Sequence, residues 1–143
     1  QPMKYSTMRQ LITFLCTGVL LCGCATSQNQ LLQAGDQLKL RSIQTRAFDT
    51  TDSVKTQRVI LATLQDLGFV IDKADKELGS ISATKLDGFA LKMTVSVRPK
   101  GETQLLVRAN AQYQLKAVED PQPYQNFFTA LSKALFLEAH QVE

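Results

Sequence analysis

Residues 90–98 read Ala-Leu-Lys-Met-Thr-Val-Ser-Val-Arg, so apolar and polar side chains alternate along the whole segment. This period of two is typical of a β-strand that buries one face and exposes the other. Residues 103–115 show the same alternation, which predicts a second strand. The side chains expected in the core are Leu91, Met93, Val95 and Val97 in the first segment and Leu105, Val107, Ala109, Ala111, Tyr113 and Leu115 in the second.

The turn that precedes this pair decides which side chains share a face. Residues 80–86 have an extended pattern, and the Asp-Gly that follows them is typical of a two-residue hairpin turn. That turn would place Ile81 opposite Thr94 and send the apolar sets to opposite faces of the sheet. We therefore predict a three- or five-residue loop with Gly88 in a left-handed conformation. The predicted cross-strand pairs are Ile81–Val95, Ala83–Met93, Val95–Val107 and Met93–Ala109.

Two other segments carry the 3.6-residue apolar repeat of amphipathic helices. The first, residues 53–67, follows the N-cap residue types of Asp-Thr-Thr-Asp at 49–52 and stops before Gly68, a favoured C-cap residue. The second begins at Asp-Pro, residues 120–121, where proline suits the first turn. The predicted buried stripes are Val54, Ile60, Leu61, Leu64 and Leu67 in the first helix and Tyr124, Phe127, Phe128, Leu131, Ala134 and Leu135 in the second.

Residues 38–48 also alternate, and residues 69–73 have an extended pattern. The order is then strand, helix, three or four antiparallel strands, helix. Because the sheet has one apolar face and each helix has one apolar stripe, both helices are expected on the same face. The predicted fold class is α+β, a two-layer sandwich of an antiparallel sheet of four to five strands with two helices packed on one face, in a single domain over residues 38–143.

The first 24 residues have the layout of an export signal. A basic stretch at 3–9 precedes an uncharged apolar run at 11–21, and small and polar residues follow. A helix over residues 11–25 would span roughly 22 Å at about 1.5 Å per residue, too short for a hydrocarbon core of about 30 Å. The tetrapeptide Leu-Cys-Gly-Cys at 21–24 resembles the lipobox of bacterial lipoproteins, with cleavage between Gly23 and Cys24.

This resemblance implies how the protein is held in the cell. In that family the Cys24 sulfur carries diacylglycerol and the new amino group carries an N-acyl chain such as palmitate. It divides the chain into a signal peptide (1–23), a lipidated Cys24 with a flexible tether (24–37) and a periplasmic domain. Ala25 after the cysteine implies sorting to the inner leaflet of a Gram-negative outer membrane. All three cysteines lie within residues 16–24, so the domain itself has no thiol.

The order of elements carries a second resemblance. Residues 67–72 (Leu-Gly-Phe-Val-Ile-Asp) and 78–83 (Leu-Gly-Ser-Ile-Ser-Ala) are similar to the helix-grip domains of a lipoprotein of the outer-membrane β-barrel assembly machinery. They also resemble small Gram-negative lipoproteins without a known role. The resemblance implies the order β-α-β-β-β-α. Because it rests on core and turn residues, it assigns no functional residue.

Residue types suited to catalysis or metal binding are scarce. His140 is the only histidine, and acids at 72, 75 and 77 alternate with lysines, as in a solvated hairpin. Removing Lys4 and Arg9 with the leader leaves 14 of the 16 bases against 13 acids, a balance without the basic footprint of a nucleic-acid-binding protein. We predict no enzyme, no metal site, no nucleic acid and no cofactor beyond the lipid on Cys24.

The remaining candidate for function is the surface. The polar side of the predicted sheet is nearly free of acids, and Leu86 and Phe89 lie at a hairpin loop. We expect a non-catalytic envelope lipoprotein that serves as an interaction or accessory module of an outer-membrane or trans-envelope assembly, with another envelope protein as partner. The alternative is a protein that binds a small lipid or hydrophobic ligand between sheet and helices. The candidate partner surface is Arg98, Arg108, Lys92, Phe89 and Leu86, and the wider polar face adds Thr94, Ser96, Gln104, Asn110, Gln112 and Gln114.

Overall fold

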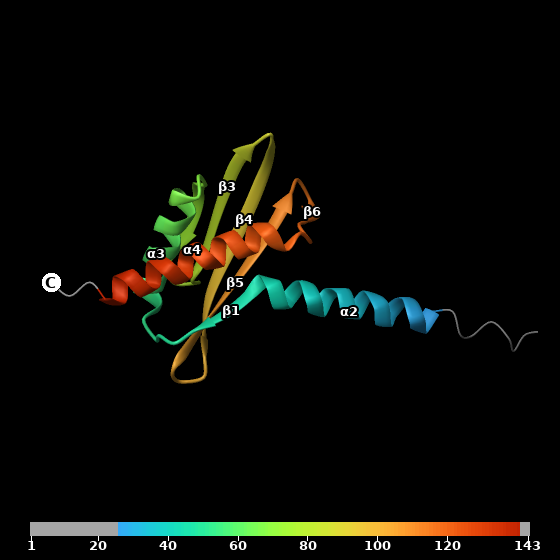
Figure 1. The fold of residues 1–143 in the computed structure, drawn as a ribbon, viewed down its shortest axis with the longest axis horizontal. Helices are drawn as coiled ribbons and strands as arrows, with labels where there is room; N and C mark the ends of the chain where they lie inside the picture. Colours follow the sequence, from blue (N-terminus) through green and yellow to red (C-terminus); the bar gives the residue numbers. More distant parts are fainter. Residues whose placement is uncertain (1–25, 141–143) are drawn as a thin grey trace, which may run out of the picture. The chain divides into compact units, whose positions relative to one another are not determined.

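The computed structural model describes residues 26–140 (Figure 1). The predicted signal peptide, Gly23 and Cys24 lie outside these residues. Along the chain the elements are α2 (Thr26–Gln44), β1 (Thr45–Phe48), α3 (Ser53–Asp66), β2 (Val70–Asp75), β3 (Ser80–Asp87), β4 (Phe89–Lys100), β5 (Gln104–Tyr113), β6 (Lys116–Ala117) and α4 (Pro121–His140). The chain divides into two compact units, one ending at Leu38 and the other beginning at Lys39. The second unit contains the whole sheet together with α3 and α4.

Helix α2 corrects two predictions. The tether expected over 24–37 is helical from Thr26 onward, and the strand expected over 38–48 is reduced to the four residues of β1. Apolar alternation fails within that segment, because Leu40 and Ile43 would point to opposite sides of a strand. In a helix, residues three apart share one face, and both side chains pack against the core.

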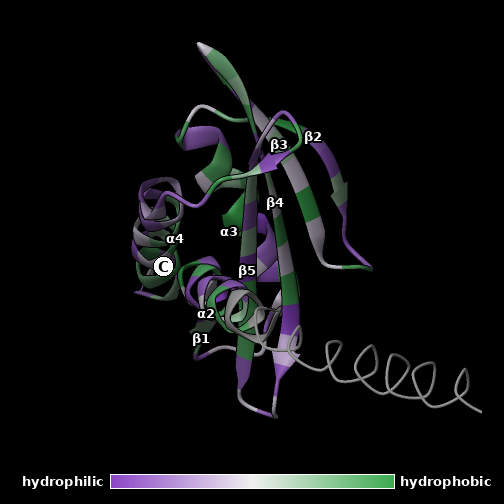
Figure 2. Ribbon diagram, turned by 90° about the vertical axis from the view of Figure 1, so that its right-hand side faces the viewer, coloured by the Kyte–Doolittle hydropathy of each residue, from purple (hydrophilic) through white to green (hydrophobic). Residues whose placement is uncertain are grey.

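The sheet is antiparallel and has six strands in the order β1-β5-β4-β3-β2, with the short β6 also paired to β5. Helices α3 and α4 cover the same face of it (Figure 2). The α+β class and the two-layer arrangement are therefore confirmed. The finer prediction differs, because the sheet has six strands rather than four to five. Along the chain, five of them rather than three or four lie between α3 and α4. The described residues also contain a third helix, α2.

The register of β3 on β4 follows the prediction. Ile81 lies opposite Val95, and Gly88 has a φ of 74° at the turn. The register of β4 on β5 is offset by two residues from the prediction, since Val95 lies opposite Ala109 and Val97 opposite Val107. A shift of two residues leaves every side chain on its predicted face, so alternation alone could not detect it.

The core lies between the apolar face of the sheet and the two helices. Its largest fully buried side chains are Tyr124, Phe127, Phe128, Ile60, Leu64, Ile81, Met93 and Leu131. One residue of the predicted α3 stripe is misplaced: Val54 is 63% exposed, whereas Val59 is buried. The buried face of α3 runs through Thr56, Val59, Ile60, Thr63 and Leu64, and Val54 lies outside it.

Two contacts fix the ends of these layers. At the β2–β3 turn, Gly79 has a φ of 61°, and a Cβ there would lie 2.7 Å from the carbonyl oxygen of Val97. Only glycine permits this close approach of the turn to β4. At the other end, the buried Tyr124 hydroxyl donates to the Val118 carbonyl (2.7 Å) and accepts from the Ala111 amide (3.3 Å) and from Gln44 Nε2 (3.2 Å). These bonds join α4, the β5–β6 hairpin and the end of α2.

Candidate functional site

The sheet face opposite α3 and α4 is here called the outer face. Of the side chains that β3, β4 and β5 direct to it, four are cations and none is an acid. The cations are Lys92, Arg98, Lys100 and Arg108. Hydroxyl and amide groups fill most of the other positions, and Ser82 Oγ lies 3.3 Å from Thr94 Oγ1 across β3 and β4. The part of the outer face formed by β3, β4 and β5 is therefore polar and carries only positive charge, whereas the edge strand β2 adds Asp75 opposite Ser80 and Asp72 beside Thr84.

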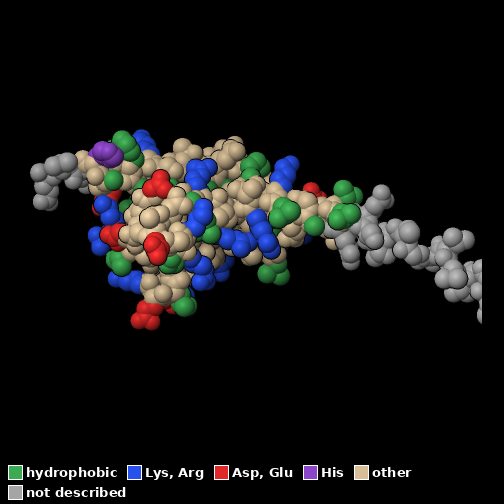
Figure 3. All heavy atoms as spheres, turned by 90° about the horizontal axis from the view of Figure 1, so that it is seen from below, with side chains coloured by type: hydrophobic (Ala, Val, Ile, Leu, Met, Phe, Trp, Pro, Cys, Tyr) green, Lys and Arg blue, Asp and Glu red, His purple; other side chains and the backbone are tan. Residues whose placement is uncertain are grey.

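The structure brings two predicted residues, Arg98 and Arg108, close together. Arg108 lies opposite Ser96 and Arg98 opposite Leu106 on the adjacent strands β4 and β5, so the two arginines are diagonal neighbours on one face. Both side chains are exposed. In the view from the β4–β5 hairpin end (Figure 3), Lys and Arg side chains are spread more widely over the surface than Asp and Glu.

Lys92 borders a shallow depression of about 310 Å³ farther along the same face. Its lining residues are Gln44, Lys92, Thr94, Asn110, Ala111, Gln112 and Ala117. Of these, Gln44 and Ala117 belong to the end of α2 and to β6. Sequence reasoning missed both, because it predicted neither element, and their approach to β5 depends on contacts between residues far apart in the chain.

Leu86 and Phe89 do not join the arginines. They lie at the tip of the β3–β4 hairpin, 84% and 73% exposed, and pair with Ala90 and Asp87. Phe89 lies opposite Asp87, so these two side chains share a face of the hairpin. Leu86 precedes Asp87 in the strand and therefore points to the other face. The candidate partner surface thus separates into an outer-face part and a hairpin tip.

The far end of β5 corrects another prediction. Tyr113 and Leu115 were expected on the buried face, but they are 43% and 95% exposed. The strand ends at Tyr113 because Gln114 adopts a φ of 55° and turns the chain into β6. Alternation in the sequence continues through this turn, so the pattern gave no sign of it.

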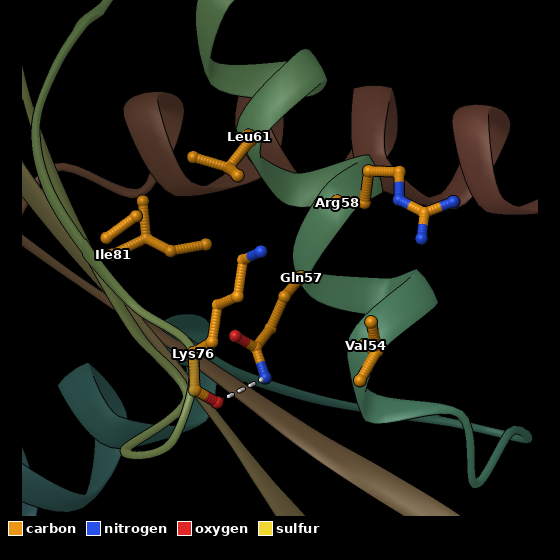
Figure 4. A pocket seen from close by; sticks show the side chains of 7 residues that line it. Val54, Gln57, Arg58, Leu61, Lys76 and Ile81 are labelled. Carbon is orange, nitrogen blue, oxygen red and sulfur yellow. Dashed lines mark hydrogen bonds between the residues drawn. The ribbon is translucent and has the colours of Figure 1, made fainter.

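A second concave site lies on the helix side of the sheet, between α3 and the edge strand β2. It is a mainly apolar groove of about 180 Å³ lined by Val54, Gln57, Arg58, Leu61, Ala74, Lys76 and Ile81 (Figure 4). The first four are at positions i, i+3, i+4 and i+7 of α3, which is one face of a helix. We call this site the α3–β2 groove. Sequence analysis missed it because Val54 and Leu61 were assigned to the core.

Polar groups elsewhere are engaged locally. Asp72 Oδ2 accepts from Thr84 Oγ1 at 2.7 Å, and Asp75 Oδ1 accepts from the Leu78 amide at 2.9 Å. His140 stacks on Phe136, with ring centroids 4.1 Å apart. Within residues 26–140, no three His, Cys, Asp or Glu side chains gather where a metal ion would be held.

Two further observations concern membrane-spanning helices and similarity to known proteins. No helix in the described part of the chain has the length and apolar character needed to cross a membrane. Comparison with known families and with curated proteins finds no match to this chain. The outer face and the α3–β2 groove are therefore the candidate functional sites.

Proposed function

We propose that this chain is a non-catalytic, lipid-anchored lipoprotein of the bacterial envelope that acts as an interaction or accessory module of an outer-membrane or trans-envelope assembly. In this proposal Cys24 holds the protein on the outer membrane and the outer face contacts a partner protein. The observation that carries it is the set of Lys92, Arg98, Lys100 and Arg108 on a face where β3, β4 and β5 place no acid.

Four cations without an acid on the exposed side of β3, β4 and β5 favour a partner with an acidic surface. Such charges steer and orient an encounter, while they contribute little to the stability of the fold. Arg98 and Arg108 are suited to this, because a guanidinium group binds a carboxylate through two parallel hydrogen bonds. The uncharged hydroxyl and amide groups around them supply further donors and acceptors.

The alternative function, binding of a small lipid between sheet and helices, has less support. It requires space among Met93, Phe127, Phe128 and Leu131. Each of these side chains is at most 1% exposed, and the rings of Phe127 and Phe128 pack edge to face with centroids 5.1 Å apart. These contacts favour a filled interior, so the interaction module is the function that we propose.

The test is the double variant Arg98→Glu/Arg108→Glu in the full chain. We expect unchanged circular dichroism and a melting temperature within a few degrees of the wild type, but a loss of partner crosslinks formed in intact cells. The matched control is Lys116→Glu/Lys133→Glu, which makes the same change of charge at exposed positions off the outer face. Equal crosslink recovery from both double variants would show that the outer face is not the docking surface.

A further inference from the structure

The α3–β2 groove combines two features used in peptide recognition. One wall is the exposed side of α3, formed by Val54 and Leu61, and the other is the edge strand β2 with Ala74. An edge strand directs alternate backbone N–H and C=O groups away from its sheet, where an extended peptide can pair with them. A helix beside such an edge supplies a pocket for side chains of that peptide.

A β-bulge in β2 shapes the floor of this groove. Ile71 pairs with Ala83 and Lys73 with Ser82, so Asp72 is the extra residue. The bulge reverses the alternation of the strand, and Ile71 and Ala74 consequently both face α3. Bulges and charges at a sheet edge also protect it from indiscriminate pairing. The segment left for pairing is short, which limits the occupant to a few extended residues.

The size of the groove indicates what enters it. Its volume of about 180 Å³ lies below the roughly 300–1,000 Å³ of typical small-molecule pockets. A cavity of about 150 Å³ accepts a benzene ring, so the groove has space for one large apolar side chain. It is too small for a lipid chain.

The positive charge of the groove indicates which type of residue accompanies the apolar side chain of the occupant. Figure 4 shows Lys76 extending from the end of β2 toward α3, while its carbonyl accepts from Gln57 Nε2 at 3.3 Å. Arg58 also lines the groove, although Figure 4 shows its guanidinium group directed away from Lys76, and none of the lining residues is an acid. Asp75 is kept off this face, since it lies opposite Ser80 and binds the Leu78 amide. A carboxylate on the occupant would therefore meet positive charge alone among the lining groups.

We propose that the α3–β2 groove binds an extended acidic peptide segment of a partner protein. The segment pairs with β2, places one apolar side chain between α3 and β2, and directs a carboxylate two residues away toward Lys76. The spacing of two follows from strand geometry, in which residues i and i+2 share a face. This site lies on the helix side of the sheet, so it does not depend on the outer-face docking proposed above.

The first experiment is selection of a phage-displayed random dodecapeptide library on the full chain in mild detergent. We expect enrichment of sequences with Leu, Ile or Phe two residues from Asp or Glu. An enriched peptide is then labelled with fluorescein and titrated by fluorescence anisotropy. Ala74→Phe, which fills the groove from an exposed position, should weaken its binding more than about tenfold. Ala62→Phe, at an exposed position of α3 outside the groove, should leave binding unchanged.

Charge exchange gives an independent readout. Lys76→Glu should weaken binding of the acidic peptide by about tenfold, and changing the acid of the peptide to Lys should restore binding to that variant. Lys133→Glu, at an exposed position of α4 outside the groove, should have no effect. The proposal is wrong if no selected peptide responds to Ala74→Phe or Lys76→Glu. It is also wrong if sedimentation shows a dimer that Ala74→Phe dissociates, because the occupant would then be a second copy of the chain.

Discussion

Removal of one buried hydroxyl should destabilise the domain strongly. Tyr124 is 1% exposed, and its hydroxyl is the common partner of the Val118 carbonyl, the Ala111 amide and Gln44 Nε2. Tyr124→Phe keeps the ring and its packing. It leaves three polar groups without this partner, in residues Gln44, Ala111 and Val118 that are each at most 6% exposed.

The magnitude follows from the three bonds. The bond to Val118, at 2.7 Å, is the shortest, and loss of a buried acceptor's partner costs about 1–2 kcal/mol. The two donors, at 3.2 and 3.3 Å, are held less tightly and contribute about 0.5–1 kcal/mol each. We therefore expect Tyr124→Phe to lower the free energy of unfolding by about 2–4 kcal/mol, against a usual total of about 5–15 kcal/mol.

Urea unfolding followed by circular dichroism measures this loss, with the m-value expected to stay unchanged. Tyr113→Phe is the control, because Tyr113 is 43% exposed. This substitution should change the free energy of unfolding by less than about 0.5 kcal/mol. Gln44→Leu in both backgrounds should give a coupling energy of about 0.5–1 kcal/mol. A Tyr124→Phe variant as stable as the control would refute a buried network at this hydroxyl.

Three other predictions concern the fold and the anchor. Val95→Asp should unfold the domain, because it places an unpaired charge in the core, whereas Thr94→Asp should be tolerated; equal melting temperatures would show that the faces are inverted. Gly79→Ala should lower the free energy of unfolding by more than about 2 kcal/mol, because a left-handed φ is combined with a clash against a β4 carbonyl. Gly88→Ala has open space around the new methyl group and should lower it by about 1 kcal/mol. Chemical denaturation of both variants measures the difference. Cys24→Ser should abolish metabolic labelling with palmitate and leave an uncleaved precursor, and continued labelling would contradict lipidation at this residue.

Much of the sheet could be predicted from the sequence, because the alternation of apolar and polar residues shows directly which side chains share one face of a strand. The pairing of Ile81 with Val95 follows from the requirement that both apolar sets enter one core. The pairing of Val95 with Ala109 rather than Val107 could not be predicted, because both registers satisfy that requirement. The choice between them depends on where the β4–β5 loop closes, around Gly101 with a φ of 63°.

The candidate sites likewise combine features that the sequence predicts with features that only the fold brings together. The common face of Arg98 and Arg108 follows from alternation, and a register shift of two residues preserves it. The depression that includes Gln44 and Ala117, and the groove that includes Val54 and Ala74, depend on segments brought together by the fold. No local pattern marks them, since an apolar side chain has the same sequence signal in a core and in a groove.

By itself, the sequence determined the two packed helices, the alternating strands and the face on which each residue of β3, β4 and β5 lies, and it predicts the lipid anchor at Cys24. Only the tertiary structure decided that residues 26–44 form a helix, that β5 ends at Tyr113 and that Val54 borders an open groove. The physical reason is that periodicity is a property of neighbours along the chain. Coverage of an apolar side chain depends instead on which distant element packs against it.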